Sequence, residues 1–95
     1  MSEHLESAAQ KLREKLDGKD FQGSVKFDVE GEGAIVADGD GVRVGDGDAE
    51  LTVSGDLDTF RDLFDGALDP TSAFMTGKIK IDGDMGAAMK LVQFL

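Results

Sequence analysis

The 95-residue chain contains no cysteine, tryptophan or tyrosine, and it has one histidine and one proline. Without cysteine it can form neither a disulfide nor a thiolate metal site, and it has no cysteine nucleophile. No apolar run approaches the roughly 20 residues of a membrane-spanning helix, and the charged N-terminus lacks the apolar segment of a signal peptide. We therefore expect residues 1–95 to form a single soluble domain in the cytoplasm.

Basic residues are also scarce. The formal net charge is −10, from 20 acidic and 10 basic residues. Residues 28–58 alone hold ten acidic residues against one base, Arg43. Nucleic-acid binding is strongly disfavoured, because it depends on clustered lysine and arginine. Charge-driven binding to anionic membranes is disfavoured for the same reason.

The spacing of apolar residues changes along the chain between the period of a helix and the alternation of a strand. The predicted helices are residues 3–16, residues 56–65, a short helix within "DPTSAFMTG" at 69–77, and a terminal helix from residue 84. The predicted strands are residues 24–30, 34–37, 42–44, 49–53 and 78–82. This order, α-β-β-β-β-α-α-β-α, predicts an α+β fold in which helices cover one face of a five-stranded, mostly antiparallel sheet. We expect the first four strands to form an antiparallel meander joined by tight turns.

Polar and glycine residues mark the expected helix ends. Side chains that can accept hydrogen bonds from a first helical turn precede three of the helices, and glycines follow them. The expected N-caps are Ser2, Asp56 and Asp69, and the expected ends are Gly18, Gly66 and Gly77.

The stretch "ADGDGVRVGDGDAE", residues 37–50, has the composition of a calcium loop. A calcium loop of the EF-hand type needs oxygen ligands at positions 1, 3 and 5, glycine at 6 and glutamate at 12. A loop beginning at Asp38 places Val42, Arg43 and Ala49 at positions 5, 6 and 12, and a loop beginning at Asp46 also fails. Asp-Gly pairs are typical of hairpin turns, so we interpret the stretch as the tips of two hairpins. The sequence leaves open whether these carboxylates bind divalent cations weakly, at millimolar concentrations.

Catalytic residues are difficult to identify. The histidine, His4, lies in the first turn of the N-terminal helix, without an evident partner to orient it as a base. No pair of carboxylates stands out as having a reason to titrate abnormally. The glycine-rich segments fit neither a phosphate loop nor a dinucleotide fingerprint. We predict no catalytic residue, no metal and no cofactor.

Methionine and phenylalanine are concentrated in the later helices. Phe60, Phe64, Phe74, Met75, Met85, Met89 and Phe94 lie on or next to them. The terminal segment "DMGAAMKLVQFL" is so apolar that sheet, partner or ligand must cover it. These residues either fill an ordinary core or surround an apolar ligand, and their pattern alone favours the core.

Residues 48–91 closely resemble the C-terminal half of the sterol carrier protein type 2 family, the nonspecific lipid-transfer domains. Three blocks carry the resemblance, in order: "LTVS" before an acidic helix start, "LDPTSAFMTGKIKIDGDMG", and "AAMKL". The resemblance implies a hydrophobic tunnel between sheet and helices and a carrier that binds sterols, fatty acids or phospholipids and moves them between membranes. The net charge of −10 favours neutral lipids or single-chain fatty acids over acyl-CoA.

The resemblance also indicates which residues line the tunnel. Phe74 and Met75, the strand residues Ile79 and Ile81, and the terminal-helix residues Met85, Ala88 and Met89 match family positions. The helical period directs three more residues to the same side, namely Phe60, Leu63 and Phe64.

Two functional hypotheses follow. The first is a non-enzymatic carrier of a lipid or fatty acid, either a monomer or a weak dimer, that makes transient contact with membranes. The alternative is an accessory subunit without catalysis, which docks its apolar C-terminal helix onto a partner.

Overall fold

The structure is a computed structural model that describes residues 3–17 and 23–95. Within these residues the helices are α1 (Glu3–Leu16), α2 (Leu57–Asp65), α3 (Pro70–Met75) and α4 (Met85–Phe94). The strands are β1 (Ser24–Val29), β2 (Gly33–Asp38), β3 (Gly41–Val44), β4 (Leu51–Gly55) and β5 (Ile79–Gly83). This order confirms the α+β prediction. The expected caps Ser2 and Gly18 lie outside the described residues, and a single domain over residues 1–95 stays a prediction.

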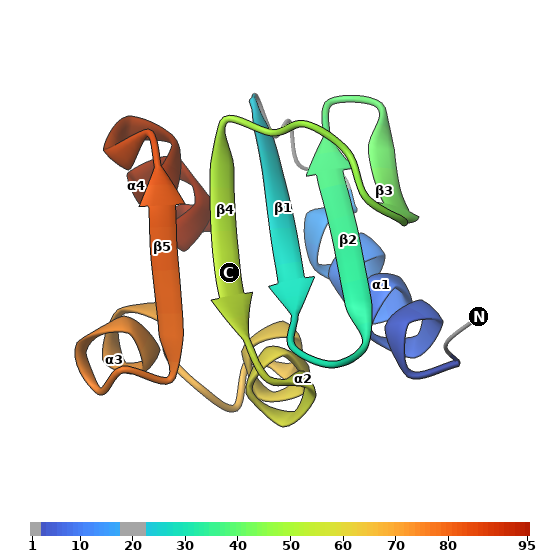
Figure 1. Ribbon diagram of the computed structural model, residues 1–95. Coiled ribbons are helices and arrows are strands. Elements are labelled where there is room, and N and C mark those ends of the chain that lie inside the picture. Colours follow the sequence, from blue (N-terminus) through green and yellow to red (C-terminus); the bar gives the residue numbers. More distant parts are fainter. Residues whose placement is uncertain (1–2, 18–22) are drawn as a thin grey trace.

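The strands form one mixed sheet in the order β3-β2-β1-β4-β5 (Figure 1). The pairs β1/β2, β2/β3 and β4/β5 are antiparallel, whereas β1 and β4 are parallel. The predicted meander is therefore correct for β1, β2 and β3 and wrong for β4. Strand β4 does not pair with β3 but lies at the centre of the sheet, with Phe27 opposite Val53.

The linker between β3 and β4, residues 45–50, makes this crossing possible. It passes over the face of the sheet that carries no helices, where the side chain of Val36 is only 3% exposed and lies close to Gly47. Lys26 on β1 binds Asp46 at 3.0 Å. The Ser24 hydroxyl accepts a hydrogen bond of 2.9 Å from the backbone N–H of Glu50. The second half of residues 37–50 is thus a crossover and not the hairpin tip that we expected.

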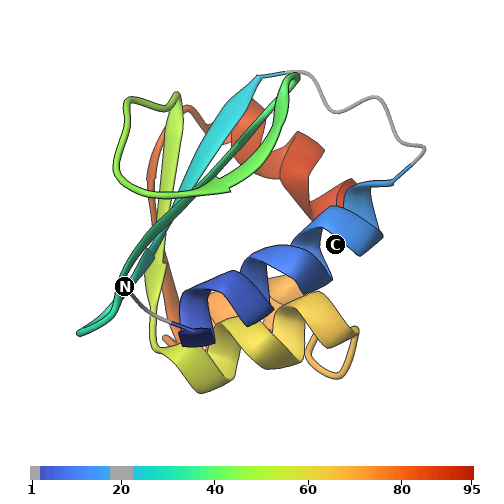
Figure 2. The same cartoon turned by 90° about the vertical axis from the view of Figure 1, so that its right-hand side faces the viewer.

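The helices pack on the other face of the sheet, and α1 lies beside α2 (Figure 2). Alternate residues of the two central strands point towards them and are at most 2% exposed, namely Val25, Phe27, Val29, Leu51 and Val53. The Phe27 ring meets Phe60 and Phe64 of α2 edge-on, with centroids 5.5 and 5.2 Å apart. At the far edge, the Arg13 guanidinium of α1 donates two hydrogen bonds to the Val42 carbonyl of β3.

Helices α2, α3 and α4 begin at aspartates. The carboxylates of Asp56, Asp69 and Asp84 accept hydrogen bonds from backbone N–H groups in the first turns of α2, α3 and α4. Helix α2 ends at Gly66, whose φ of 79° is the left-handed conformation that glycine adopts at little cost. Among the described residues, no helix is both long enough and apolar enough to cross a membrane.

We predict that Asp56→Ala lowers the free energy of unfolding by about 1 kcal/mol at pH 7, because it removes the N-cap of α2. The Thr59 hydroxyl and backbone N–H hydrogen bonds, aided by the charge of Lys78, hold the pKa of Asp56 below its ordinary value. The ionised carboxylate therefore stabilises the folded state above about pH 4, and this contribution is lost as the pH falls through the folded-state pKa.

Urea unfolding of both proteins between pH 3 and pH 7 measures the difference. The stabilities should converge at the acid end, and a gap that stayed constant with pH would contradict the role of the ionised cap.

Candidate functional site

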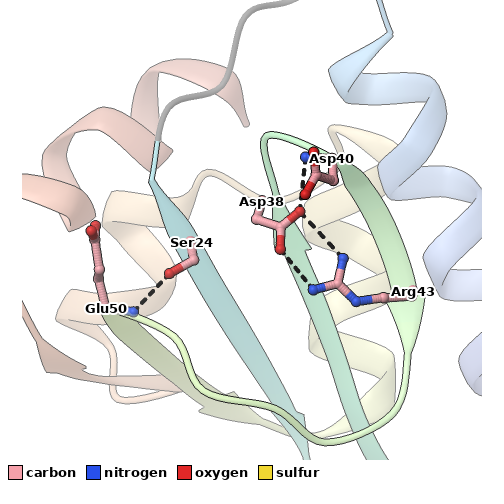
Figure 3. Close-up of polar contacts among 5 residues, drawn as sticks. All are labelled: Ser24, Asp38, Asp40, Arg43 and Glu50. Atoms are coloured by element: carbon pink, nitrogen blue, oxygen red, sulfur yellow. Dashed lines mark hydrogen bonds and ion pairs between the residues drawn. The ribbon is translucent and has the colours of Figure 1, made fainter.

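The acidic stretch at residues 37–50 is held by internal pairing. The Arg43 guanidinium binds Asp38 through two hydrogen bonds, of 2.7 and 3.2 Å, and the Asp40 backbone N–H donates a third (Figure 3). The Arg43 contact lowers the pKa of the Asp38 carboxyl. In residues 3–17 and 23–95, no group of three or more acidic or histidine side chains is placed to hold a metal ion. These contacts of Asp38 stabilise the β2–β3 hairpin, and the described side chains around it form no metal site.

The interior that the structure describes is almost wholly apolar, and Thr59 is the polar residue buried in it. His4 is exposed on α1, where its Nδ1 lies 3.0 Å from Nη2 of Arg61. Every buried side-chain nitrogen or oxygen of the described residues has a hydrogen-bond partner. The shifted pKa values of Lys26, raised by Asp46, and of Asp46, lowered by Lys26, belong to an ion pair on the helix-free face.

An apolar pocket lies between the β4–β5 half of the sheet and helices α2, α3 and α4. Its volume is about 140 Å³. Strands, helices and the C-terminal residue all contribute to its wall, which consists of Phe27, Val53, Leu63, Pro70, Phe74, Ile79, Ile81, Met85, Ala88, Met89, Leu91, Val92 and Leu95. Because every one of these side chains is hydrocarbon or thioether, none can hydrogen-bond strongly to a ligand.

Helix α4 explains why space remains here. The helix begins at its N-cap Asp84, directly after β5, and packs against the sheet with its buried residues Ala87, Ala88 and Leu91. A methyl group at position 88 fills little of the distance to the sheet, so the neighbouring strand residues Ile79 and Ile81 stay in contact with empty space. A longer side chain at this position would occupy the pocket.

The pocket opens to solvent between α3 and α4. Met85, Met89 and Val92 recur at i, i+4 and i+7 on α4, and their exposed fractions are 58%, 70% and 38%. Phe74 of α3 is 46% exposed. All four side chains also line the pocket, so they form its mouth.

The structure brings together most of the residues that the sequence singled out. Seven of the predicted tunnel residues line the pocket, namely Leu63, Phe74, Ile79, Ile81, Met85, Ala88 and Met89. The other three lie elsewhere. Phe60 and Phe64 stack on each other at 5.9 Å in the packed core, beside Phe27. Met75 is 79% exposed at the end of α3, directly after the mouth residue Phe74 in the sequence.

Six residues of the wall were not predicted from the sequence, namely Phe27, Val53, Pro70, Leu91, Val92 and Leu95. The spacing of Ala88, Leu91 and Leu95 on one side of α4 is a helical signal that could have identified two of them. The alternation of β1 and β4 indicates that Phe27 and Val53 point inward. The alternation does not show whether an inward-facing side chain packs against another side chain or borders a cavity.

Known proteins resemble the chain in sequence and in fold. A family model described as the SCP-2 sterol transfer family matches residues 2–95. Hydroxysteroid dehydrogenase-like protein 2 of Danio rerio is 40% identical over 85 residues, which are 81% of this chain and 20% of that protein. The chain therefore spans about one fifth of the length of this relative.

Two solved structures from Aedes aegypti share the fold. Sterol Carrier Protein 2 Like 2 has a TM-score of 0.80 and 18% identity, with 97% of this chain and 96% of that chain covered. Sterol Carrier Protein-2 in complex with the C16 fatty acid palmitate has a TM-score of 0.76 and 22% identity, with 99% and 96% covered.

We predict that the core and the mouth respond differently to truncation. Phe60→Ala should lower the free energy of unfolding by about 3–5 kcal/mol, because the Phe60 ring is fully buried against Phe27. Met89→Ala should change it by about 0.5 kcal/mol or less, because 70% of Met89 is exposed.

Urea unfolding followed by circular dichroism measures both values, and Phe60→Leu serves if Phe60→Ala does not fold. Equal losses for the two positions would contradict this division between packed core and pocket mouth.

Proposed function

The chain belongs to the SCP-2 sterol transfer family, and on this basis we propose that it is a lipid carrier whose pocket between β5, α3 and α4 encloses the hydrocarbon part of a lipid. The observation that carries the proposal is a wholly apolar pocket with an exposed, methionine-rich mouth. Burial of a hydrocarbon chain there gains about 25 cal/mol per Å² of apolar surface, before the cost of ordering the chain. The carrier holds and transfers its ligand without catalysing a reaction, and a cytoplasmic location stays a prediction.

The proposed ligand is a single acyl chain. The relative from Aedes aegypti in complex with palmitate supports a fatty acid. Pockets for small ligands are typically about 300–1,000 Å³, whereas this pocket measures about 140 Å³. A ligand must therefore widen the pocket. A flexible chain can enter step by step as Met85 and Met89 rotate about their unbranched side chains, and a rigid ring system needs the full width at once.

The proposed position of the ligand's polar head is outside the pocket, in water. No residue of the wall could bind a carboxylate or a phosphate, and enclosing a charged group without a partner costs several kcal/mol or more. The net charge of −10 further disfavours the highly charged head of an acyl-CoA. A protonated or water-exposed carboxyl and a neutral head group fit this arrangement.

The proposed ligand contacts are the seven predicted residues of the wall, together with Phe27, Val53 and Leu91 from its inner end. Ala88 is the most informative position, because it is 5% exposed and faces the space. We predict that Ala88→Leu weakens palmitate binding at least tenfold, which corresponds to about 1.4 kcal/mol. The larger side chain adds three carbon atoms to a space of about 140 Å³.

Displacement of a fluorescent fatty-acid analogue measures this affinity without interference, because the chain has no tryptophan or tyrosine. Ala67→Leu is the matched control, since Ala67 is exposed between α2 and α3 and is not part of the wall. Binding that is unchanged by Ala88→Leu would place the ligand elsewhere.

Thermal unfolding supplies a second measurement on the same proteins. Palmitate at a hundred times its Kd should stabilise the native protein by about 2.7 kcal/mol. For a domain of this size, that raises Tm by roughly 10 °C or more. Ala88→Leu should lose most of this increase, while its own Tm without lipid stays the same or rises because the cavity is smaller. A Tm that did not respond to palmitate in the unmodified protein would count against the carrier.

The alternative, an accessory subunit that docks its C-terminal helix, has one supporting observation, the exposure of Met85, Met89 and Val92 on α4. It predicts that palmitate has no effect on Tm, so the same measurement separates the two functions.

A further inference from the structure

The large apolar side chains that are exposed in the described part of the chain all lie on two helices. They are Phe74, Met75, Met85, Met89 and Val92, and we call them the mouth patch. Their exposed fractions range from 38% to 79%. Exposed apolar residues scattered singly need no explanation, but a concentration on one part of the surface marks a site of interaction. Helix α3 lies near the start of β5 and α4 near its end (Figure 1), and side chains of both helices line the same pocket.

Charge is almost absent from the same helices. Charged residues make up 32% of the chain, yet Lys90 is the only one in α3 and α4. Residues 70–95 contain three lysines and two aspartates, a formal charge of +1, so the remaining residues carry −11. The acidic β2–β3 hairpin, with Asp38 and Asp40, lies at the opposite edge of the sheet from β5. The protein thus presents an apolar, weakly basic region on an otherwise strongly acidic body.

The mouth patch is also continuous with the pocket. Phe74, Met85, Met89 and Val92 belong to both, so whatever covers the patch also covers the mouth. A protein partner or a second copy would close the pocket against lipid exchange. The hydrocarbon of a bilayer would instead let a ligand pass between pocket and membrane without exposure to water.

We infer that the mouth patch docks onto the surface of a phospholipid bilayer, with Met75, Met89 and Phe74 inserted among the lipids and Lys90 at the level of the phosphates. This inference rests on the proposed carrier function and names the surface through which the carrier meets its lipid source. A dimer through the same patch is disfavoured, because it brings together two chains that each carry a net charge of −10. A specific protein interface normally has a polar rim of hydrogen-bonding groups, whereas α3 and α4 contribute few.

Salt should affect this docking in an unusual direction. Successive strands are about 4.8 Å apart, so the acidic β3 edge lies about 19 Å from β5. This distance is within the Debye length of about 30 Å at 0.01 M salt but exceeds the length of about 8 Å at 0.15 M. The acidic body is therefore repelled by an anionic vesicle at low salt and screened from it at physiological salt. Binding to anionic vesicles should increase with salt, opposite to the behaviour of proteins that bind membranes through basic patches.

The test is flotation with vesicles of pure phosphatidylcholine, and of phosphatidylcholine with phosphatidylserine at 0.01 and 0.15 M salt. Met75→Glu is the decisive variant, because Met75 is 79% exposed in the patch and is not part of the pocket wall. We expect it to lower the vesicle-bound fraction at least tenfold while palmitate displacement stays within twofold of the unmodified protein. Ala88→Leu should show the reverse, with vesicle binding kept and palmitate binding lost.

The matched charge control is Gln10→Glu, which adds one negative charge at an exposed position of α1. It should alter neither measurement. If the unmodified protein binds palmitate but not vesicles, or if Met75→Glu binds vesicles normally, the docking surface is wrong and the carrier function stands. If light scattering shows a dimer that Met75→Glu dissociates, the occupant is a second copy. If vesicles are bound but palmitate is not, the carrier function fails and the patch alone remains supported.

Discussion

The parallel pairing of β1 with β4 determines where every other element lies. It places β1 and β4 side by side in the interior of the sheet and leaves β3 and β5 at the edges. Helix α1 then packs beside α2 and over β2 and β3, whereas α3 and α4 flank β5 in the sequence and lie near it in space (Figure 1). An antiparallel β3–β4 pair would put β5 on the far side of β3. The space between β5 and α4 exists because the crossover at residues 45–50 places β4 next to β1.

Phe27 lies between the packed aromatic core and the apolar pocket. One side of its ring packs edge-on against Phe60 and Phe64, and the same residue forms part of the pocket wall. On the α2 side, large rings fill the volume above the sheet. On the α4 side, the helix turns Ala87 and Ala88 towards the strands, and the volume is not filled. A single sheet face is thereby divided into a packed core and a cavity.

The local features of the fold could be predicted from the sequence because they depend on neighbours in the chain. The alternation of Val25, Phe27 and Val29 identifies a strand and its buried face, and Asp56 and Gly66 mark the ends of α2. The partner of β4 could not be predicted, since its alternation fits beside either β1 or β3. The same limit applies to the site. Helical spacing directs Phe60, Leu63 and Phe64 to one side of α2, but only Leu63 reaches the pocket, because Phe27 occupies the space in front of the two rings.

The crossover also has a consequence for how the molecule folds. Strands β1, β2 and β3 pair with neighbours in the sequence, so this hairpin unit can form from contacts of low contact order. The pairing of β1 with β4 must wait for the chain to return across two strands, and β5 and α4 follow it. The half of the protein that contains the pocket thus depends on contacts between more distant residues. Opening of this half alone, ahead of global unfolding, is the expected pattern in native-state hydrogen exchange, and it would admit a ligand while the three-stranded unit and α1 stay folded.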